Sequence, residues 1–175
     1  CDGVQTCALP IYVLDRVLKA AKSANADLIV ELWGDSPLMD ANILNDLIDF
    51  YLKNNYDCVG TNLPNFDKTY PFGLSALIFP LKILDEVDKI TQNPDDRENV
   101  SNYIYEHPDK YKIATLPCPK ELNFPNIRLT VDEQNDFDLI EIIFKELYPK
   151  NPKFSAIEVV DRKSTRLNSS HITIS

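Results

Sequence analysis

The sequence predicts an α/β fold in which a mainly parallel sheet carries helices on both faces. Short apolar runs, rich in β-branched and aromatic residues, alternate along the chain with longer segments whose apolar residues recur at helical spacing. Turn signals built from Gly, Asp, Asn and Pro separate these segments. At 175 residues the chain has the length of one domain with a substantial core. Strands that alternate with helices in this way are typical of βαβ units.

The first part of the chain predicts a helix at 13–24, because its apolar residues fall on one helical face. A short apolar run at 28–33 suits a buried parallel strand, and it stops at the turn Gly34-Asp35-Ser36-Pro37. A second amphipathic helix is expected at 41–54. A strand at 56–61 follows it.

The second part begins with a Pro- and Asn-containing loop at 62–72 and a strand at 74–79. The same periodicity arguments then predict helices at 81–91, 95–106 and 136–148, and strands at 112–116 and 127–131.

The two ends differ in character from the middle of the chain. Residues 1–11 and 162–175 do not continue the periodicity of their neighbours, and the second stretch is rich in Ser and Thr. Both resemble translated adapter DNA, so we treat them as non-native tails and expect one domain at 12–161. The natural protein is then expected to begin well before Tyr12.

The composition narrows the class of partner. The formal net charge is −9 and no basic stripe is present, which argues against nucleic-acid binding. No apolar run has the length of a membrane span, so we expect a cytosolic protein without a membrane partner. Four cysteines without a CxxC pair and two histidines do not indicate a zinc site.

Two acidic residues follow predicted strands. Asp35 comes after the strand that ends at Trp33, and Asp132 after the strand that ends at Val131. Ligands of open α/β sheets bind at the carboxyl ends of strands, and two carboxylates there suit Mg²⁺, which completes its shell with phosphates. Two other interpretations remain open at this point, an Asx-turn role for Asp35 and a helix N-cap role for Asp132.

Four segments in order resemble the cytidylyltransferase family, which includes spore-coat polysaccharide biosynthesis protein F, CMP-sialate synthetases and CMP-KDO synthetases. The resemblance covers residues 12–160 and implies a nucleotide-diphospho-sugar transferase-like (Rossmann-like) fold. The segments are VLDRVLKAAKSANADLIVELWGDSP at 13–37, Tyr70-Pro71-Phe72-Gly73-Leu74, Asp96-Arg97-Glu98-Asn99-Val100 and Arg128-Leu129-Thr130-Val131-Asp132-Glu133, the first of them containing both a helix and the Gly-Asp turn.

The resemblance implies roles for individual residues. Asp35 and Asp132 are implied to be catalytic Mg²⁺ ligands, with Gly34 allowing the backbone to approach the nucleotide. Asp15 and Arg16 match a pair near the cytidine, with a surface ion pair as the alternative. The residues implied to border the acceptor sugar are Pro71, Gly73, Arg97, Glu98 and Arg128, with a structural charge pair as the alternative for Arg97 and Glu98.

The chain departs from the family pattern in two ways. Asn99, Leu77 and Phe72 stand where the family often has a histidine, an acidic residue and a polar residue, which leaves the identity of the sugar open. The family's N-terminal strands and glycine-containing phosphate loop have no counterpart in this sequence. We therefore expect an exposed sheet edge, and no measurable turnover by the 175-residue chain itself.

By this resemblance, the complete enzyme uses CTP and Mg²⁺ to activate a sugar or sugar acid for polysaccharide or glycan biosynthesis, and it releases pyrophosphate. A homodimer is compatible with this class. Two alternatives remain, a metal-dependent glycosyltransferase of related fold and a non-catalytic binding module. A cytidylyltransferase releases pyrophosphate from CTP, whereas a glycosyltransferase does not. A non-catalytic binding module predicts that Asp35→Ala in a full-length homologue leaves function intact.

Overall fold

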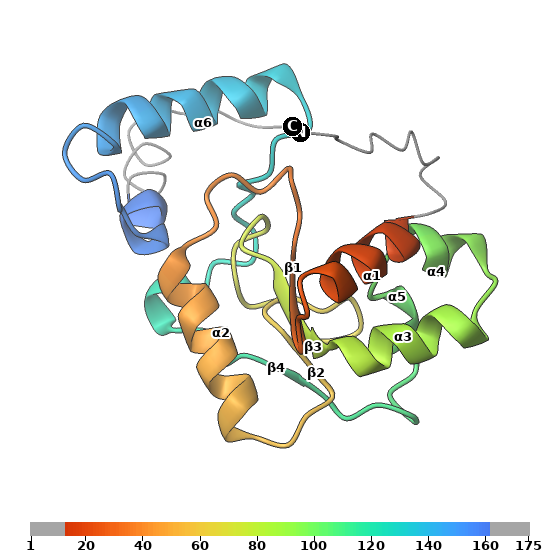
Figure 1. Ribbon diagram of the computed structural model, residues 1–175. Coiled ribbons are helices and arrows are strands. Elements are labelled where there is room, and N and C mark those ends of the chain that lie inside the picture. The colour runs from red at the N-terminus through yellow and green to blue at the C-terminus, as the bar shows by residue number, and fades with distance from the viewer. Residues whose placement is uncertain (1–12, 162–175) are drawn as a thin grey trace.

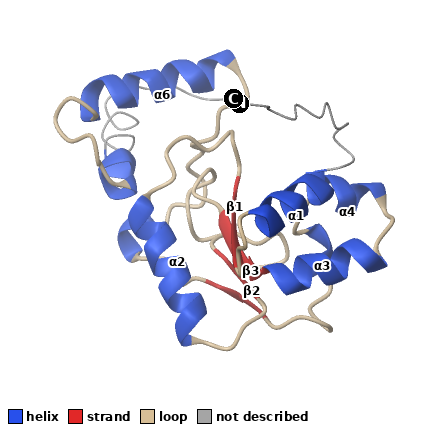
Figure 2. Cartoon of the chain, viewed as in Figure 1, coloured by secondary structure: helices blue, strands red, loops and turns tan. Residues whose placement is uncertain are grey.

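The computed structural model describes residues 13–161 as a four-stranded sheet with helices packed on both faces (Figures 1 and 2). The predicted tails at 1–11 and 162–175 lie outside the described residues. The strands are β1 (Leu28–Leu32), β2 (Cys58–Gly60), β3 (Ala76–Pro80) and β4 (Ile113–Thr115), in the spatial order β1-β3-β2-β4.

The strand directions agree with the prediction for β1, β2 and β4, which all run the same way. Both β1 and β2 pair antiparallel with β3, and β4 pairs parallel with β2. The reversed direction of β3 was not predicted, because apolar alternation does not encode strand direction. Leu32 pairs with Ala76 and Gly60 with Leu77, so the carboxyl ends of β1 and β2 meet the amino end of β3 at one edge.

The sheet separates two apolar cores, because neighbouring side chains of a strand point to opposite faces. Ala76 and Ile78 of β3 face the core that includes helix α2 (Ala41–Lys53). Leu77 and Phe79 face the other core, which includes α1 (Val13–Ser23) and α3 (Leu81–Ile90). Figure 1 shows α2 on one side of the sheet and α1 and α3 on the other.

One edge of the sheet has no neighbour among the described residues. Strand β1 pairs only with β3, and its side chains Val30 and Leu32 are 37% and 48% exposed. The prediction of a buried strand at 28–33 was therefore wrong, because only Ile29 of β1 is buried.

The C-terminal part continues the core on the α2 side. Helix α6 (Gln134–Leu147) begins with a capping box in which Glu133 and Asp136 bond each other's backbone, and it buries Ile140 and Ile143. Residues 156–161 are helical as well, which was not predicted. Their first amide, that of Ala156, donates at 2.7 Å to the carboxylate of Asp40, whose other oxygen caps α2.

The predicted helix at 95–106 is two short helices, α4 (Pro94–Glu98) and α5 (Asn102–Glu106). The buried carboxylate of Asp96 causes the break, because it accepts hydrogen bonds from Thr91 at 2.6 Å and from Asn102 at 2.9 Å. A single helix over the whole segment was therefore wrong.

The predicted strand at 127–131 was also wrong. This segment follows the short 3₁₀ helix η2 (Lys120–Leu122), and its only strand-type pairing among the described residues is one isolated bridge, between Phe72 and Arg128. The amide of Phe72 donates to the carbonyl of Ile127 at 2.8 Å, and the amide of Leu129 donates to the carbonyl of Phe72 at 2.7 Å. Its partner is a loop rather than a strand, so the pairing does not propagate. No helix within residues 13–161 has the length and apolar character to cross a bilayer.

Candidate functional site

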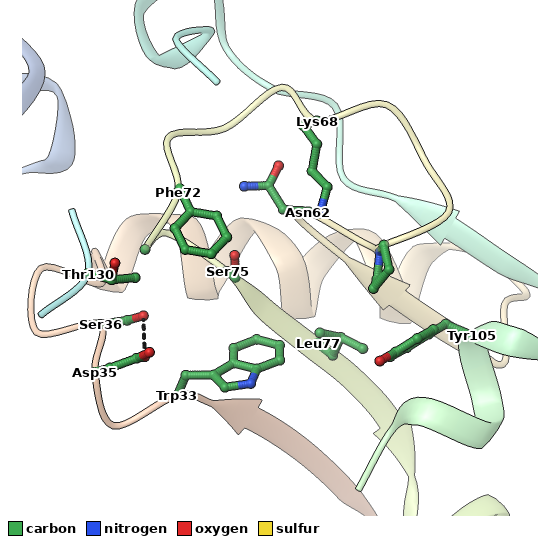
Figure 3. Close-up of a pocket in the computed structure, with 12 residues that line it drawn as sticks. Trp33, Asp35, Ser36, Asn62, Lys68, Phe72, Ser75, Leu77, Tyr105 and Thr130 are labelled. Atoms are coloured by element: carbon green, nitrogen blue, oxygen red, sulfur yellow. Dashed lines mark hydrogen bonds between the residues drawn. The ribbon is translucent and has the colours of Figure 1, made fainter. Parts of the chain in front are cut away.

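A pocket of about 250 Å³ opens at the edge where β1 and β2 end and β3 begins (Figure 3). This position is where ligands bind in open α/β sheets. Its walls come from the turn after β1, the loop after β2, the start of β3, helix α5 and the segment before α6. The lining residues are Trp33, Asp35, Ser36, Asn62, Pro64, Lys68, Phe72, Gly73, Ser75, Leu77, Tyr105 and Thr130.

Asp35 lies in a tight turn at the end of β1. The amide of Ser36 donates to the carbonyl of Trp33 at 3.2 Å, which closes the turn, and the Ser36 hydroxyl donates to the Asp35 carboxylate at 3.1 Å. Within the described residues, no backbone amide of the turn is recorded as a donor to that carboxylate, so the turn does not depend on an Asx bond. The exposed Asp35 carboxylate therefore remains accessible to a ligand in the pocket.

The loop after β2 is held by two buried polar side chains. The Asn62 amide donates to the carbonyl of Tyr70 at 3.0 Å and accepts from the amides of Thr69 and Tyr70 at 3.3 and 3.2 Å. The Thr61 hydroxyl donates to the carbonyl of Leu74 and accepts from the amide of Ala76. These bonds hold the two ends of the loop together, so the pocket wall that it forms is preorganised.

Gly73 permits the closest backbone approach in the site. Its φ is +101°, and a Cβ at this position would lie 2.7 Å from the carbonyl carbon of Leu129 and 2.9 Å from the amide nitrogen of Thr130. Only glycine adopts this conformation without strain and leaves this space empty. The fold therefore requires glycine at position 73 for steric reasons. The same close approach brings Thr130 to the pocket wall.

Asp132 lies beside the pocket rather than among its lining residues. Its carboxylate accepts a hydrogen bond from Thr130 at 2.8 Å and forms an ion pair with Arg128. The predicted position after a strand was wrong, since 127–131 is not a strand. The N-cap interpretation was also wrong, because Glu133 is the N-cap of α6.

The segment carrying Asp132 is nevertheless attached to the turn carrying Asp35. The amide of Val131 donates to the carbonyl of Asp35 at 2.9 Å. Thr130 completes the connection, since it lines the pocket with Asp35 and donates to Asp132. The two acidic residues that the sequence places far apart are thus neighbours along two bonded backbone segments.

The carboxylates of Asp35 and Asp132 fit Mg²⁺ in part. Mg²⁺ is commonly held by one or two carboxylates together with substrate phosphates, and Asp35 offers an accessible carboxylate of this kind. Asp132 offers a second, whose charge is presently compensated by Arg128, so a metal ion there must replace that ion pair. No group of three or more acidic, His or Cys side chains arranged for a metal ion occurs within residues 13–161.

Several residues singled out from the sequence lie outside the pocket lining. Asp15 pairs with Lys19 at 2.7 Å on the surface of α1, not with Arg16, which is exposed. Arg97 pairs with Asp88 at 2.8 Å and connects α4 to α3, which agrees with a structural role but not with pairing to its neighbour.

Three further predicted residues have different surroundings. Glu98 is exposed on α4 and does not line the pocket. Pro71 is buried behind the pocket and accepts from the amide of Leu74 through its carbonyl. Gly34 has open space where a Cβ would stand, so the fold itself does not require glycine there. Room for a ligand is present at this turn.

The sequence argument missed most of the lining side chains. Trp33 was predicted only as the end of a strand. Lys68 and Tyr105 were not predicted as site residues, because a loop and a separate short helix bring them to the pocket. The exposed aromatic residue directly before the Gly-Asp turn was the one signal that could have indicated a binding surface.

Two ionisable groups of the fold do not favour nucleophilic chemistry. Burial in the core, outside the pocket lining, raises the pKa of the Cys58 thiol to about 12, so this thiol stays protonated near neutral pH. Burial, followed by the charges of Glu106, Glu31 and Asp96, raises the pKa of Tyr105, whose phenol therefore remains a neutral hydrogen-bonding group.

Comparison with known proteins gives consistent matches. The sequence profile described as cytidylyltransferase matches residues 12–169. An uncharacterized protein of Methanocaldococcus jannaschii, MJ1063, is 34% identical over 168 residues, which cover 88% of this chain and 67% of that protein. The spore coat polysaccharide biosynthesis protein SpsF of Bacillus subtilis is 26% identical over 149 residues, covering 85% of this chain and 59% of SpsF.

A solved structure agrees with the sequence matches. A cytidylyltransferase from Leptospira borgpetersenii serovar Hardjo-bovis superposes with a TM-score of 0.79 and 28% identity, over 94% of this chain and 67% of that one. The chain thus spans 59–67% of the length of these proteins. Its open mixed sheet with flanking helices is a nucleotide-sugar transferase-like fold. The chain belongs to the cytidylyltransferase family of nucleotidyltransferases.

Proposed function

We propose that this chain carries the metal-binding wall of a CTP- and Mg²⁺-dependent cytidylyltransferase that activates a sugar or sugar acid. The observation that carries the proposal is the attachment of the Asp132 segment to the Asp35 turn through the amide of Val131, beside a pocket at the carboxyl edge of the sheet. Membership of the cytidylyltransferase family supports the choice of nucleotide. The name of SpsF supports polysaccharide biosynthesis as the pathway that consumes the product.

In the proposed reaction, an oxygen of the acceptor attacks the α-phosphorus of CTP. A new P–O bond forms, the bond between the α-phosphorus and the bridging oxygen breaks, pyrophosphate leaves, and the acceptor hydroxyl loses its proton. Such transfers depend mainly on positioning and on compensation of phosphate charge. Bound Mg²⁺ supplies positive charge at the phosphate oxygens, which a chain of net charge −9 otherwise lacks.

The residues of this chain contribute positioning. Asp35 presents its carboxylate to the pocket, and Thr130 orients the carboxylate of Asp132 by a hydrogen bond. The bonds of Asn62 fix the opposite wall, so that an acceptor bound there meets a preformed surface. Because CTP is a cytoplasmic metabolite, we propose the cytoplasm as the site of the reaction.

The metal site can be tested without turnover. Mn²⁺ in place of Mg²⁺ gives an electron paramagnetic resonance signal that separates free from bound ion. CTP itself chelates Mn²⁺ and is left out of this measurement, and we expect saturable binding to the chain that is about tenfold weaker in Asp35→Asn. Asp109→Asn, which removes an exposed carboxylate outside the pocket, is the matched control. Equal Mn²⁺ binding by Asp35→Asn, Asp109→Asn and the unchanged chain contradicts the proposal.

The reaction itself is tested by its second product. A full-length relative that shares the Asp35 turn is expected to release one pyrophosphate from CTP for each sugar consumed. A glycosyltransferase transfers a sugar from a nucleotide sugar and releases no pyrophosphate, so product analysis separates the two activities. Pyrophosphate release that persists after the Asp35 equivalent is changed to Ala contradicts the assigned role.

A further inference from the structure

Two aromatic side chains face one another across the mouth of the pocket. The indole of Trp33 enters from the turn after β1 and the ring of Phe72 from the loop before β3, with Ser75 between them (Figure 3). Their side chains are 39% and 45% exposed, although both belong to residue types that are usually well buried. Tyr105 and Leu77 extend this apolar lining further into the pocket.

The position of Phe72 is fixed by neighbours outside the pocket. Its backbone forms the isolated bridge with Arg128, and the Arg128 guanidinium lies 5.5 Å from the centre of the Phe72 ring. The same guanidinium pairs with Asp132. The aromatic wall and the acidic wall of the site are therefore connected through one arginine, and the ring cannot move without disturbing the contacts of that arginine.

Trp33 is connected to the other acidic residue through the turn after β1. It is the first residue of the turn that Ser36 closes, two positions before Asp35. Trp33, Phe72 and Asp35 line the same pocket. A group that packs between the two rings therefore lies in the pocket to which Asp35 presents its carboxylate.

We propose that Trp33 and Phe72 are specificity-determining residues of the acceptor subsite, and that they select a sugar presenting an apolar face, such as a deoxy or N-acetyl sugar. This inference rests on the proposed function and names the acceptor class. The aromatic walls formed by Trp33 and Phe72 favour ligands that bury apolar surface between them on binding. A fully hydroxylated ring must instead give up hydration where it meets these two rings, whose faces offer no hydrogen bonds in return.

The size and polarity of the pocket favour the acceptor over the nucleotide. A volume of about 250 Å³ is below the usual range for drug-sized ligands and suits a single sugar ring rather than a nucleoside triphosphate. The only cationic lining residue within the described part of the chain is Lys68. One lysine does not balance a triphosphate, so the aromatic part of the pocket is assigned to the smaller substrate.

The chain contains a built-in probe for this test, because Trp33 is its only tryptophan. Tryptophan fluorescence, excited at wavelengths that the eight tyrosines do not absorb, therefore reports this pocket alone. We would titrate the 175-residue chain, with Mg²⁺ and CTP present, with two pairs of sugars: 6-deoxyglucose against glucose, and N-acetylglucosamine against glucose. We expect saturable changes in Trp33 emission, with the deoxy or the N-acetyl sugar bound at least about threefold more tightly than glucose.

The variant Phe72→Ala removes one of the two aromatic walls and keeps Trp33 as the fluorescent reporter. We expect the dissociation constant of the preferred sugar to rise about tenfold, and its preference over glucose to disappear. Phe137→Ala removes a phenyl group that is 53% exposed on α6 and is the matched control. Because Phe72 is half exposed, the variant is expected to fold, which circular dichroism checks.

Two results overturn the inference. The first is the absence of saturable binding by every sugar of the series, and the second is equal affinity and selectivity in Phe72→Ala and Phe137→Ala. Mn²⁺ binding, measured without CTP on the same protein preparations, keeps this outcome separate from the fate of the proposed function. Absence of sugar selectivity in the unchanged chain, with intact, Asp35-dependent Mn²⁺ binding, refutes only the acceptor assignment. Failure of Mn²⁺ binding refutes the metal site, whatever the sugars do.

Discussion

Asp35 and Val131 are joined by a backbone hydrogen bond of 2.9 Å, from the amide of Val131 to the carbonyl of Asp35. The bond crosses between two turns that are almost a hundred residues apart in the sequence. It holds the residue that precedes Asp132 against the turn at the end of β1. The acidic wall of the site therefore depends on loop geometry rather than on neighbouring strands.

Removing the cation that accompanies Asp132 should strengthen metal binding. Arg128→Met deletes the charge that pairs with Asp132 and keeps most of the side-chain length. Because Arg128 and a metal ion compete for the same carboxylate, we expect Mn²⁺ affinity to rise about threefold, and Asp132→Asn to lower it. Electron paramagnetic resonance measures both. Unchanged affinity in both variants would exclude Asp132 as a ligand.

Gly73 should tolerate no side chain. In Gly73→Ala, the new Cβ meets the backbone of Leu129 and Thr130 at a φ of +101°, and we expect the free energy of unfolding to fall by about 2–3 kcal/mol. Gly34→Ala is the matched control, since no atom lies within 4 Å of its Cβ position. Urea denaturation of both variants tests the difference. A similar small effect at both positions would contradict the close approach at Gly73.

Asn62 should determine the order of the loop that it spans. Asn62→Ala leaves the buried carbonyl of Tyr70 and the amides of Thr69 and Tyr70 without their partner, which costs about 2–3 kcal/mol of unfolding free energy. Hydrogen exchange of residues 63–70 is expected to accelerate before global unfolding. In Asn65→Ala, which removes an exposed amide from the same loop, exchange should remain as in the unchanged chain. Equal protection in the two variants would show that Asn62 does not hold the loop.

Glu31 should make stability fall as pH rises. Burial raises the pKa of its carboxyl, while a hydrogen bond from Ser101 lowers it to a smaller extent, and the Oε2 atom is buried without a hydrogen-bond partner among the described residues. The folded state therefore holds the proton more tightly than the unfolded state. The contribution of Glu31 to the free energy of unfolding is fully present below the pKa of 4.5 that this carboxyl has in the unfolded chain. It is lost as pH rises through the higher pKa of the folded state.

The neutral variant Glu31→Gln avoids the cost of ionisation. We expect its melting temperature to exceed that of the unchanged chain at about pH 8, and the difference to shrink towards about pH 4. Thermal melts monitored by circular dichroism across this interval measure the trend, with the exposed Glu121→Gln as the control. A difference that grows as pH falls would have the wrong sign and would contradict burial as the dominant cause.

The sequence predicted those features that depend on local pattern. Apolar periodicity placed α1, α2 and α6 within a few residues of their observed bounds. The Gly-Asp turn after β1 was predicted at its observed position, because a short apolar run ended at strong turn residues. Asp35 was accordingly found at a pocket edge.

Features that depend on distant partners were not predictable in this way. The antiparallel placement of β3 and the conversion of 127–131 into a single bridge are set by the loop before β3, which pairs with Arg128. The break between α4 and α5 is set by buried polar bonds of Asp96. The assignment of Arg97 to a substrate pocket came from family resemblance alone, and the fold directs this side chain to Asp88.

The carboxylate of Asp40 bonds the amide of Asn42 with one oxygen and the amide of Ala156 with the other. Asp40 follows the Asp35 turn by a few residues. Its carboxylate therefore connects the first turn of the helix at 156–161 to the segment proposed to bind a ligand. A shift of the Asp35 turn on ligand binding is therefore expected to reach the helix at 156–161 through Asp40. Chemical shifts at Ala156 would register occupancy of a pocket whose walls this residue does not form.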